Sequence, residues 1–264
     1  MDEPTTFFIV PYRDREQHLQ IYLNHMKCVL EGINCKILII HQCDKRLFNR
    51  GAMKNIGFRY IKDKFPDTYK DKTLVFNDVD NVPWKKGILD FNTTKGIIKH
   101  HYGFPVKQAA SLGGIFTIIA SDFEKTNGFP NLWTWGMEDN ALYWRSLKEK
   151  LTIDYSNYFK VGSPNIILFW HGPSRLVNEA KSWDEFINIK DNNAGFGLNN
   201  ITNLGYDSKI YQERENVVLV NINSFDVPEK IPTGIVKKIP NSSFKHSSDT
   251  EKHSKKYSIF KTLF

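Results

Sequence analysis

The sequence predicts an α/β fold in which helices flank a mostly parallel, twisted central sheet. Short apolar runs typical of buried strands alternate with segments of helical periodicity along the N-terminal third of the chain. The order strand, helix, strand, helix, strand is that of a doubly wound parallel sheet. With 264 residues, of which 41% are hydrophobic and 14% aromatic, the chain is long enough to bury a sizeable core.

Five elements are expected in the N-terminal part. They are a strand at Thr6–Val10, a helix at Gln17–Glu31, a strand at Lys36–His41, a helix at Phe48–Lys62 and a strand at Thr73–Asn77. The two helices show apolar residues recurring on one face, and Gly32 ends the first of them. Pro11–Arg15 is expected to form a basic turn where the first strand ends.

Further elements follow a Gly113-Gly114 pair. A strand is expected at Ile115–Ala120, a turn at Asn127–Pro130, a helix after Met137, a buried strand at Asn165–Trp170 and a last strand at Val217–Ile222. The polar segment Ser174–Asn193 carries Trp183 and Phe186, which favours a lid that closes over a site. We expect one domain over residues 1–223. The remainder, 224–264, is rich in Lys, Ser and Pro, and Ser224–Lys256 is expected to be mostly disordered.

Polar segments follow the first three strands. In an open parallel sheet the ends of these strands meet at one edge, where ligands bind. Pro11–Arg15, Gln42–Arg50 and Asp78–Asp80 should therefore converge. If strand alternation continues, the carboxylates of Asp78 and Asp80 point to the same side and suit Mg²⁺ or Mn²⁺ holding a diphosphate. The alternative is a turn that ends the strand and is capped by Asp78.

The stretch Gly113–Arg145 combines aromatic and acidic residues. Trp133 and Trp135 precede Glu138 and Asp139, and this combination is typical of carbohydrate sites, where aromatic faces stack on sugars and carboxylates accept hydroxyl protons. The alternative is a helix N-terminus whose acids favour the helix dipole. His171 ends the predicted strand Asn165–Trp170 and is either a metal ligand or a histidine satisfied by hydrogen bonds.

The net charge and the cysteine content limit the class of protein. The formal charge is +7, and Phe225–Phe264 contributes eight lysines against four acidic residues. Because no basic helix or arginine cluster accompanies this charge, nucleic-acid binding is not expected. Three cysteines without a CxxC pair do not predict a zinc site and favour free thiols in a reducing compartment.

The sequence shows neither a signal peptide nor an apolar run of roughly 18–20 residues, so no transmembrane segment is expected. These features predict a cytoplasmic protein. The apolar Tyr257–Phe264 after two lysines is expected to dock on the body or to touch a membrane or partner.

Seven motifs in order resemble the β-1,4-galactosyltransferases. Pro11–Arg15 resembles the family's Pro-Phe-Arg-Asn-Arg nucleotide loop, Phe48–Arg50 its Phe-Asn-Arg donor segment, and Asp78–Pro83 its Asp-Val-Asp metal motif. Gly113-Gly114, Asn127–Asn131, Trp135–Asp139 and Gly197–Asn199 follow at similar intervals. Each motif is weak alone, but seven in order, spanning Thr6 to Tyr206, are specific.

The resemblance implies a GT-A-like nucleotide-sugar transferase fold and an inverting, Mn²⁺-dependent transfer from UDP-galactose or UDP-N-acetylgalactosamine to a glycan acceptor, with Mg²⁺ as the alternative metal. Asp139 would be the general base, and Glu138, also in the catalytic site, would position the sugars. Asp80 and His171 would bind the metal. The implied donor residues are Pro11, Tyr12, Arg13, Arg15, Phe48, Arg50, Asp78, Val79, His101 and Gly114. The implied acceptor residues are Trp135, Gly136, Met137, Trp183 and Phe186.

Several positions depart from the family pattern. Met137 replaces a glycine, Asn140 an acid, Leu168 a methionine that often joins the metal site, and His101 a phosphate-contacting lysine. Ser111 replaces an aromatic residue that faces C2 of the donor sugar, which leaves room for an N-acetyl group and predicts that UDP-N-acetylgalactosamine is accepted. The family's luminal anchor and disulfides are also missing, which favours a bacterial, viral or cytosolic enzyme. The departures keep a second hypothesis open, a glycan- or nucleotide-sugar-binding protein that has lost catalysis.

Overall fold

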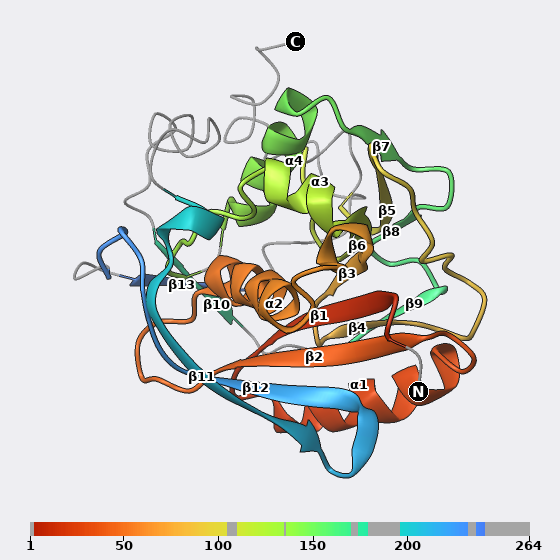
Figure 1. Ribbon diagram of the computed structural model, residues 1–264, viewed down its shortest axis with the longest axis horizontal. Coiled ribbons are helices and arrows are strands. Elements are labelled where there is room, and N and C mark those ends of the chain that lie inside the picture. The colour runs from red at the N-terminus through yellow and green to blue at the C-terminus, as the bar shows by residue number, and fades with distance from the viewer. Residues whose placement is uncertain are drawn as a thin grey trace.

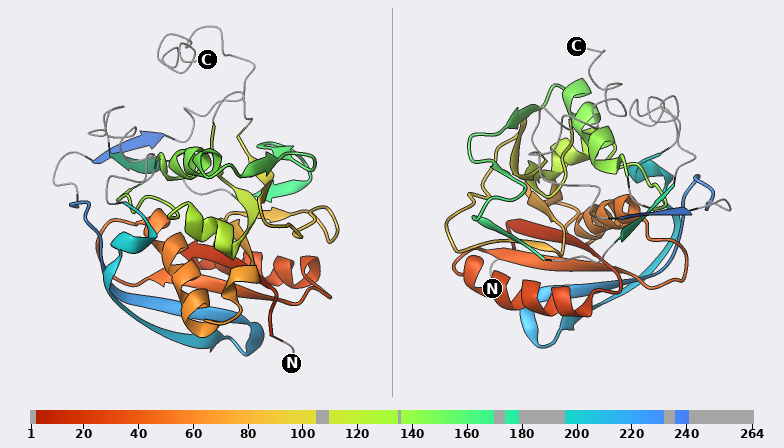
Figure 2. Two further views of the ribbon diagram at one scale, coloured as in Figure 1. Left: turned by 45° about the horizontal axis from the view of Figure 1, so that its top comes forward. Right: turned by 180° about the vertical axis from the view of Figure 1, so that it is seen from behind.

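Side chains of the first strand are all buried, and alternate ones pack into two different apolar layers. In strand β1 (Thr6–Tyr12), Phe7 and Ile9 pack with helix α2 (Arg50–Lys64) on one face of the sheet. Phe8 and Val10 pack with helix α1 (Glu16–Val29) on the other. This two-residue period is what a strand buried on both faces produces. Figures 1 and 2 show α1 and α2 on opposite faces of the sheet.

The computed structural model describes residues 3–104, 110–134, 136–169, 174–178, 196–231 and 236–240. Besides β1, α1 and α2, its first half contains β2 (Cys35–Gln42), a 3₁₀ turn η1 (Tyr69–Asp71), β3 (Thr73–Asn77), β4 (Asn81–Pro83), β5 (Ile97–Gly103), β6 (Ile115–Ile119) and α3 (Ala120–Lys125). Its second half contains α4 (Glu138–Lys148), β7 (Thr152–Asp154), β8 (Phe159–Lys160), β9 (Ile166–Leu168), β10 (Ser174–Asn178), η2 (Leu198–Asn200), β11 (Thr202–Tyr211), β12 (Arg214–Asp226) and β13 (Val236–Pro240).

Within these residues, nine strands form the central sheet. Its order is β11-β12-β2-β1-β3-β6-β5-β7, and β8 pairs with β5 beside this path. The middle of the sheet is parallel: β1 pairs with β2 and β3, and β2 also pairs with β12. β6 then pairs antiparallel with β3, and β11 pairs antiparallel with β12. The predicted α/β architecture with a mostly parallel centre is therefore confirmed, with antiparallel strands added outside it.

Strand β1 runs further than expected. It continues through Pro11 and Tyr12, which pair with Ile40 and His41 of β2, so these two residues belong to the strand and not to a turn. On its other side β1 pairs with β3 only as far as Ile9. Pro11, which has no backbone N–H to donate, therefore lies beyond the part of β1 that is paired on both sides.

The predicted buried strand at Asn165–Trp170 is shorter and lies elsewhere. Only Ile166–Leu168 is a strand, and it pairs with β4 in a separate two-stranded sheet. Leu168 is 44% exposed. Periodicity cannot tell a central strand from a short peripheral one when the apolar run is this brief.

The C-terminal part also differs from the expectation. β12 runs to Asp226, beyond the predicted end at Ile222, and is preceded by β11, a strand the sequence analysis did not identify. β10 lies in the predicted lid segment and pairs with β13, which lies in the segment expected to be mostly disordered. The rest of the lid, including Trp183 and Phe186, and the terminal Tyr257–Phe264 lie outside the described residues. The domain boundary stays a prediction.

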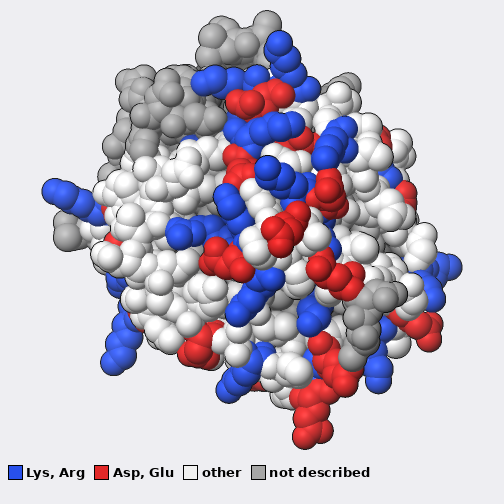
Figure 3. Space-filling view, viewed as in Figure 1, with Lys and Arg blue, Asp and Glu red and all other residues white. Residues whose placement is uncertain are grey.

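The surface charge and the lengths of the helices give two further findings. The face shown in Figure 3 carries acidic and basic side chains side by side and not one continuous basic area. Among the helices that the structure describes, none is both long and apolar enough to span a bilayer.

Candidate active site

The loops after β1 and β2 line a cleft of about 460 Å³. Arg13 and Asp14 form one side, and the segment His41–Leu47 forms the other. Arg13 donates a hydrogen bond to the carbonyl oxygen of Arg46 at 2.5 Å, and its guanidinium lies 5.2 Å from the centre of the Phe48 ring. The expected convergence of these two loops at the end of the sheet is therefore found.

Asn49 fixes the start of α2. Its Oδ1 accepts a hydrogen bond from the Ala52 backbone N–H at 2.9 Å, and its Nδ2 donates to the carbonyl oxygen of Asn131 at 3.0 Å. Its own N–H donates to Oε1 of Gln42 at the end of β2. The cap thus ties α2 to the sheet and to the segment before α4, and it sets Arg50 as the first helical residue.

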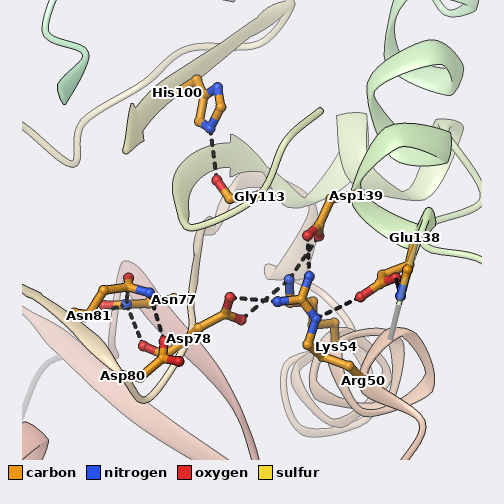
Figure 4. Close-up of polar contacts among 11 residues, drawn as sticks. Arg50, Lys54, Asn77, Asp78, Asp80, Asn81, His100, Gly113, Glu138 and Asp139 are labelled. Carbon is orange, nitrogen blue, oxygen red and sulfur yellow. Dashed lines mark hydrogen bonds and ion pairs between the residues drawn. The ribbon is translucent and has the colours of Figure 1, made fainter. Parts of the chain in front are cut away.

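Arg50 binds three carboxylates from two other segments (Figure 4). Its Nε donates to Glu138 Oε1 at 2.8 Å, its Nη1 to Asp78 Oδ2 at 2.6 Å, and its Nη2 to Asp139 Oδ2. The Arg50 side chain is 16% exposed, so these pairs are only partly screened by water. Residues implied for donor binding, base catalysis and sugar positioning are in this way brought together.

Lys54 joins the same cluster from one helical turn further on. Its Nζ lies 3.2 Å from Asp139 Oδ1 and 3.6 Å from Asp78 Oδ1, and the side chain is only 1% exposed. The sequence analysis missed this residue. The available signal was its spacing, since positions four apart on a helix share a face and Arg50 was already assigned to the site.

Glu138 and Asp139 begin helix α4. The preceding residue, Met137, has φ of 65°, a left-handed conformation that turns the chain sharply into the helix. Burial is the largest influence on the pKa of Glu138 and would raise it, but Arg50, Lys54 and a backbone hydrogen bond together outweigh burial, and the pKa is lowered. For Asp139, burial together with the like charges of Glu138 and Asp78 outweighs the two cations and raises the pKa. Two adjacent carboxyls thus differ in proton affinity, as expected when one of them has to take up a proton.

Gly113 and Gly114 precede β6 and pack closely. A Cβ at Gly113 would lie 3.1 Å from Oδ2 of Asp139, and one at Gly114 would lie 2.2 Å from the carbonyl oxygen of Tyr102. Gly113 therefore leaves room beside the Asp139 carboxylate, whereas Gly114, with φ of 78°, is required by contact with β5. The Leu112 N–H also donates to the Asp139 carbonyl oxygen at 3.0 Å, so Ser111 directly precedes a residue bound to Asp139.

Asp78 and Asp80 do not point the same way, contrary to the expectation from strand alternation. β3 ends at Asn77, and a turn follows in which the Asn81 N–H donates to the Asp78 carbonyl oxygen. Asp78 reaches Arg50, whereas Asp80 Oδ1 accepts a hydrogen bond from Asn81 Nδ2 at 3.0 Å (Figure 4). The chain has left the strand, so its two-residue period no longer applies.

Asp80 and His171 are the two residues expected to bind a metal. His171 lies outside the described residues, and those described contain no group of three or more His, Cys, Asp or Glu placed to hold an ion. The Phe169 N–H donates to the carbonyl oxygen of Asp80 at 2.7 Å, two positions before His171. The half-buried Asp80 carboxylate is a hard oxygen donor of the kind that Mn²⁺ and Mg²⁺ accept, so it fits the implied metal.

His101 does not occupy the position expected of a phosphate-binding residue. Its side chain is 1% exposed, its Nε2 is 2.7 Å from Thr117 Oγ1, and its ring packs on Phe91. Burial lowers the pKa of His101 to about 4, so the ring is neutral near pH 7. A neutral imidazole inside the sheet cannot replace a lysine at a phosphate.

The other residues assigned from the sequence are placed as follows. Tyr12 is buried and donates to Glu16 Oε2, Arg15 lies at the start of α1 with its Nη1 3.5 Å from His18 Nδ1, and Val79 is buried. Gly136 donates from its N–H to Glu138 Oε2, and Met137 packs near Leu132 and Ala141. Trp135, Trp183 and Phe186 lie outside the described residues, so their acceptor role stays a prediction.

Comparison with known proteins places this geometry in a family. The profile of the N-terminal region of glycosyl transferase group 7 matches residues 3–89, and that of the N-terminal domain of galactosyltransferase matches residues 95–167. The chain belongs to the β-1,4-galactosyltransferase family.

Two curated relatives in this β-1,4-galactosyltransferase family illustrate how similar their sequences are to that of the chain. A xylosylprotein 4-β-galactosyltransferase of Caenorhabditis elegans is 34% identical over 190 residues, covering 67% of this chain and 64% of the relative. β-1,4-Galactosyltransferase 1 of Bos taurus is 26% identical over 215 residues, covering 74% of this chain and 48% of the relative. The chain thus spans about half to two thirds of the length of these relatives.

Solved structures share the fold of this β-1,4-galactosyltransferase-family chain. The catalytic domain of Drosophila β-1,4-galactosyltransferase 7 with xylobiose has a TM-score of 0.62 at 21% identity, covering 83% of this chain and 94% of that one. A mutant of the same enzyme with manganese, UDP-Gal and xylobiose has a TM-score of 0.66 at 22% identity and the same coverage. The predicted GT-A-like fold is confirmed.

The family assignment also corrects one expectation. The predicted cytoplasmic location is wrong, because the curated relatives are animal β-1,4-galactosyltransferases, which are enzymes of the Golgi type. The sequence argument had relied on missing features of this chain, which carry no information about location.

Proposed function

We propose that the protein is a hexosyltransferase that moves galactose from UDP-galactose to a hydroxyl group of an acceptor sugar, with inversion at the anomeric carbon. One observation carries the proposal. Asp139, a carboxyl that is 16% exposed and has a raised pKa, lies beside Gly113 and is joined through Arg50 to Asp78, directly after β3. A base is thereby linked to the edge of the sheet where α/β proteins bind nucleotides.

The donor end of the site is the cleft after β1 and β2. Three basic residues and two acids line it, Arg13, Lys45 and Arg46 against Asp14 and Asp44, so its net charge is positive. The Phe48 ring lies against the Arg13 guanidinium. A flat aromatic ring beside cations suits a uracil base carrying a diphosphate. Arg50, the first residue of α2, comes three residues after Leu47 of the cleft and binds Asp139.

The chemical step follows from the position of Asp139. Its carboxylate takes the proton from the acceptor hydroxyl while that oxygen forms a bond to the anomeric carbon, and the bond from this carbon to the diphosphate oxygen breaks. UDP leaves with the bonding electron pair, and the proton remains on Asp139. A base placed in this way contributes typically 10²–10⁴-fold to the rate. Glu138, kept ionised by Arg50, is suited to accept hydrogen bonds from sugar hydroxyls.

Asp80 and His171 are the residues we propose for Mn²⁺. When bound, the ion would neutralise charge on the departing diphosphate. The solved Drosophila relative with manganese and UDP-Gal supports this part of the proposal. Leu168, which precedes Phe169 at the end of β9, offers no ligand atom, so the ion is expected to bind with fewer protein ligands than in the family pattern.

Two features guide the choice of substrates. Ser111 is a small residue directly before Leu112, whose N–H donates to the backbone carbonyl oxygen of Asp139. Its small side chain, in place of the aromatic residue of the family pattern, is the reason to propose space for an N-acetyl group on the donor. The C. elegans relative is named for a xylosylprotein substrate, and the Drosophila structures contain xylobiose. We therefore propose UDP-N-acetylgalactosamine as a second donor and a β-xyloside as the first acceptor to examine.

Release of UDP tests the function. The protein would be incubated with Mn²⁺, each of UDP-galactose, UDP-N-acetylgalactosamine and UDP-glucose, and a panel of acceptors including xylosides, N-acetylglucosaminides and glucosides. UDP release that depends on both an acceptor and Mn²⁺, with a product of matching mass, supports the proposal. Binding of UDP-galactose without product on any acceptor would instead favour a protein that binds sugar nucleotides without catalysis, the hypothesis that Leu168, Met137 and Asn140 motivate.

A further inference from the structure

Lys54 is the most deeply buried cation of the carboxylate cluster. Its side chain is 1% exposed, and its Nζ lies 4.7 Å from the centre of the Phe129 ring as well as beside Asp139 and Asp78. Lysine is almost never buried unless its charge is paired. Because breaking such a pair leaves an uncompensated buried charge, Lys54 is held in place by the acids it contacts.

Arg50 and Lys54 divide the oxygens of the two aspartates between them. Arg50 binds Oδ2 of Asp78 and Oδ2 of Asp139, whereas Lys54 lies at Oδ1 of each. Arg50 remains 16% exposed, so it can exchange a carboxylate for another anion that enters the site. Lys54 has no such access to water. Of the two cations, Lys54 is therefore the permanent partner of Asp139.

We propose that Lys54 is a positioning residue: it holds Asp139 by Oδ1 and stabilises its anion. Oδ2, the oxygen beside Gly113 that Arg50 binds in this structure, then accepts the proton of the acceptor hydroxyl once Arg50 pairs with the donor diphosphate. The inference rests on the proposed function and deepens it. It assigns the role of holding the base to Lys54, a residue that none of the motifs in the sequence includes. Arg50 is then free to serve the donor diphosphate without leaving Asp139 unpaired.

The charges around Asp139 determine the direction in which its pKa should change when Lys54 is removed. Helix α2 contributes Arg50 and Lys54, the turn after β3 contributes Asp78, and α4 itself contributes Glu138. The segment before β6 presents the backbone of Gly113, whose carbonyl oxygen lies 2.8 Å from His100 Nε2. Removing Lys54 leaves two acids and one cation around Asp139. The anion of Asp139 should then be less stable, and its proton should be lost at higher pH.

The test measures how kcat/KM for the acceptor depends on pH. In Lys54→Met, which keeps the volume of the side chain and removes its charge, the acidic limb of the profile should move up by about one to two pH units. The activity lost near neutral pH should return at higher pH, and UDP affinity should stay within about threefold of the wild type. An acidic limb that does not move, or a loss equal at every pH, would overturn the proposal by leaving Lys54 a purely structural role.

Two further variants complete the design. Lys62→Met removes another lysine of α2, one that is 44% exposed and pairs with Glu124, and should leave the pH profile unchanged. If Lys54→Met does not fold, Lys54→Gln keeps a donor to Oδ1 without the charge and should show the same shift. A wild type that is inactive with every UDP-hexose refutes the proposed function itself. An active wild type with an unmoved limb in the variants refutes only the role of Lys54.

Discussion

The carboxylates of Asp78 and Asp139 are joined through the same two cations. Asp78 follows β3 and Asp139 lies in the first turn of α4, and Arg50 and Lys54 of α2 bind both. One helix thus couples the residue that ends a parallel strand to the candidate base. The three elements cannot move independently without breaking partly buried ion pairs, which is costly.

The first prediction concerns the base. Asp139→Asn keeps the size of the side chain but cannot accept a proton at neutral pH, so kcat should fall by about 10²–10⁴-fold. UDP affinity, measured by isothermal titration, should be retained because the cleft after β1 and β2 is untouched. Glu124→Gln, which alters an ion pair with Lys62 on the opposite end of α2, is the matched control. Activity within a few-fold of the wild type would show that Asp139 is not the base.

The second prediction concerns the metal. Asp80→Ala should remove the increase in UDP affinity that Mn²⁺ produces while leaving metal-free binding unchanged, because the carboxylate proposed to bind the ion is lost. Titrations of UDP with and without Mn²⁺ measure both quantities. Asp71→Ala removes a mostly exposed acid paired with Lys95 and serves as control. If Mn²⁺ enhances UDP binding equally in Asp80→Ala, Asp80 is not a ligand.

Much of the fold followed from local patterns, and the reasons are visible in single elements. Thr73–Asn77 was expected as a strand and is β3, because β-branched and aromatic residues between polar flanks favour a strand. Asn165–Trp170 looked similar but forms only a short peripheral strand. The two runs differ in the strand with which each one pairs. Strand pairing depends on tertiary packing, which a local sequence pattern does not contain.

The same division applies to the site. The clustering of Arg50, Glu138 and Asp139 followed from motifs in order. Lys54 and His101 did not, because each depends on burial: a lysine four residues after an arginine normally faces water, and a histidine next to a strand end normally does too. Here α2 is buried on most of its circumference, and β5 is covered on both faces. These two side chains are therefore inside, where Lys54 pairs with two acids and burial lowers the pKa of His101.

The third prediction concerns the cap of α2. Asn49→Ala removes the acceptor for the Ala52 N–H and the donor to the Asn131 carbonyl, both buried, so the free energy of unfolding should fall by about 2 kcal/mol. Chemical denaturation measures the change. Asn92→Ala, which removes an exposed side-chain amide bound to Asp90, should cost far less. Equal losses for the two variants would contradict a specific role for the cap.

The fourth prediction concerns stability in mild acid. Burial lowers the pKa of both His100 and His101 to about 4, from an ordinary value of 6.5. Between these values the unfolded chain binds more protons than the folded one, so the free energy of unfolding should fall as pH drops from 6.5 to 4, by up to about 3 kcal/mol per histidine. His101→Gln should flatten this dependence in denaturation curves recorded at pH 5 and 7. A slope unchanged by the variant would show that His101 does not contribute.

The last prediction concerns the donor. By the resemblance to the family, Ser111 takes the place of an aromatic residue, and the next residue, Leu112, donates its N–H to the backbone carbonyl oxygen of Asp139. The wild type should therefore turn over UDP-N-acetylgalactosamine at a rate comparable to UDP-galactose. Ser111→Tyr fills that space and should lower the first rate at least tenfold relative to the second, since an added ring overlaps an acetamido group but not a hydroxyl. Ser111→Ala, which keeps the space, should behave like the wild type. Strict rejection of UDP-N-acetylgalactosamine by the wild type would defeat the hypothesis, because the space would then be closed by some other side chain.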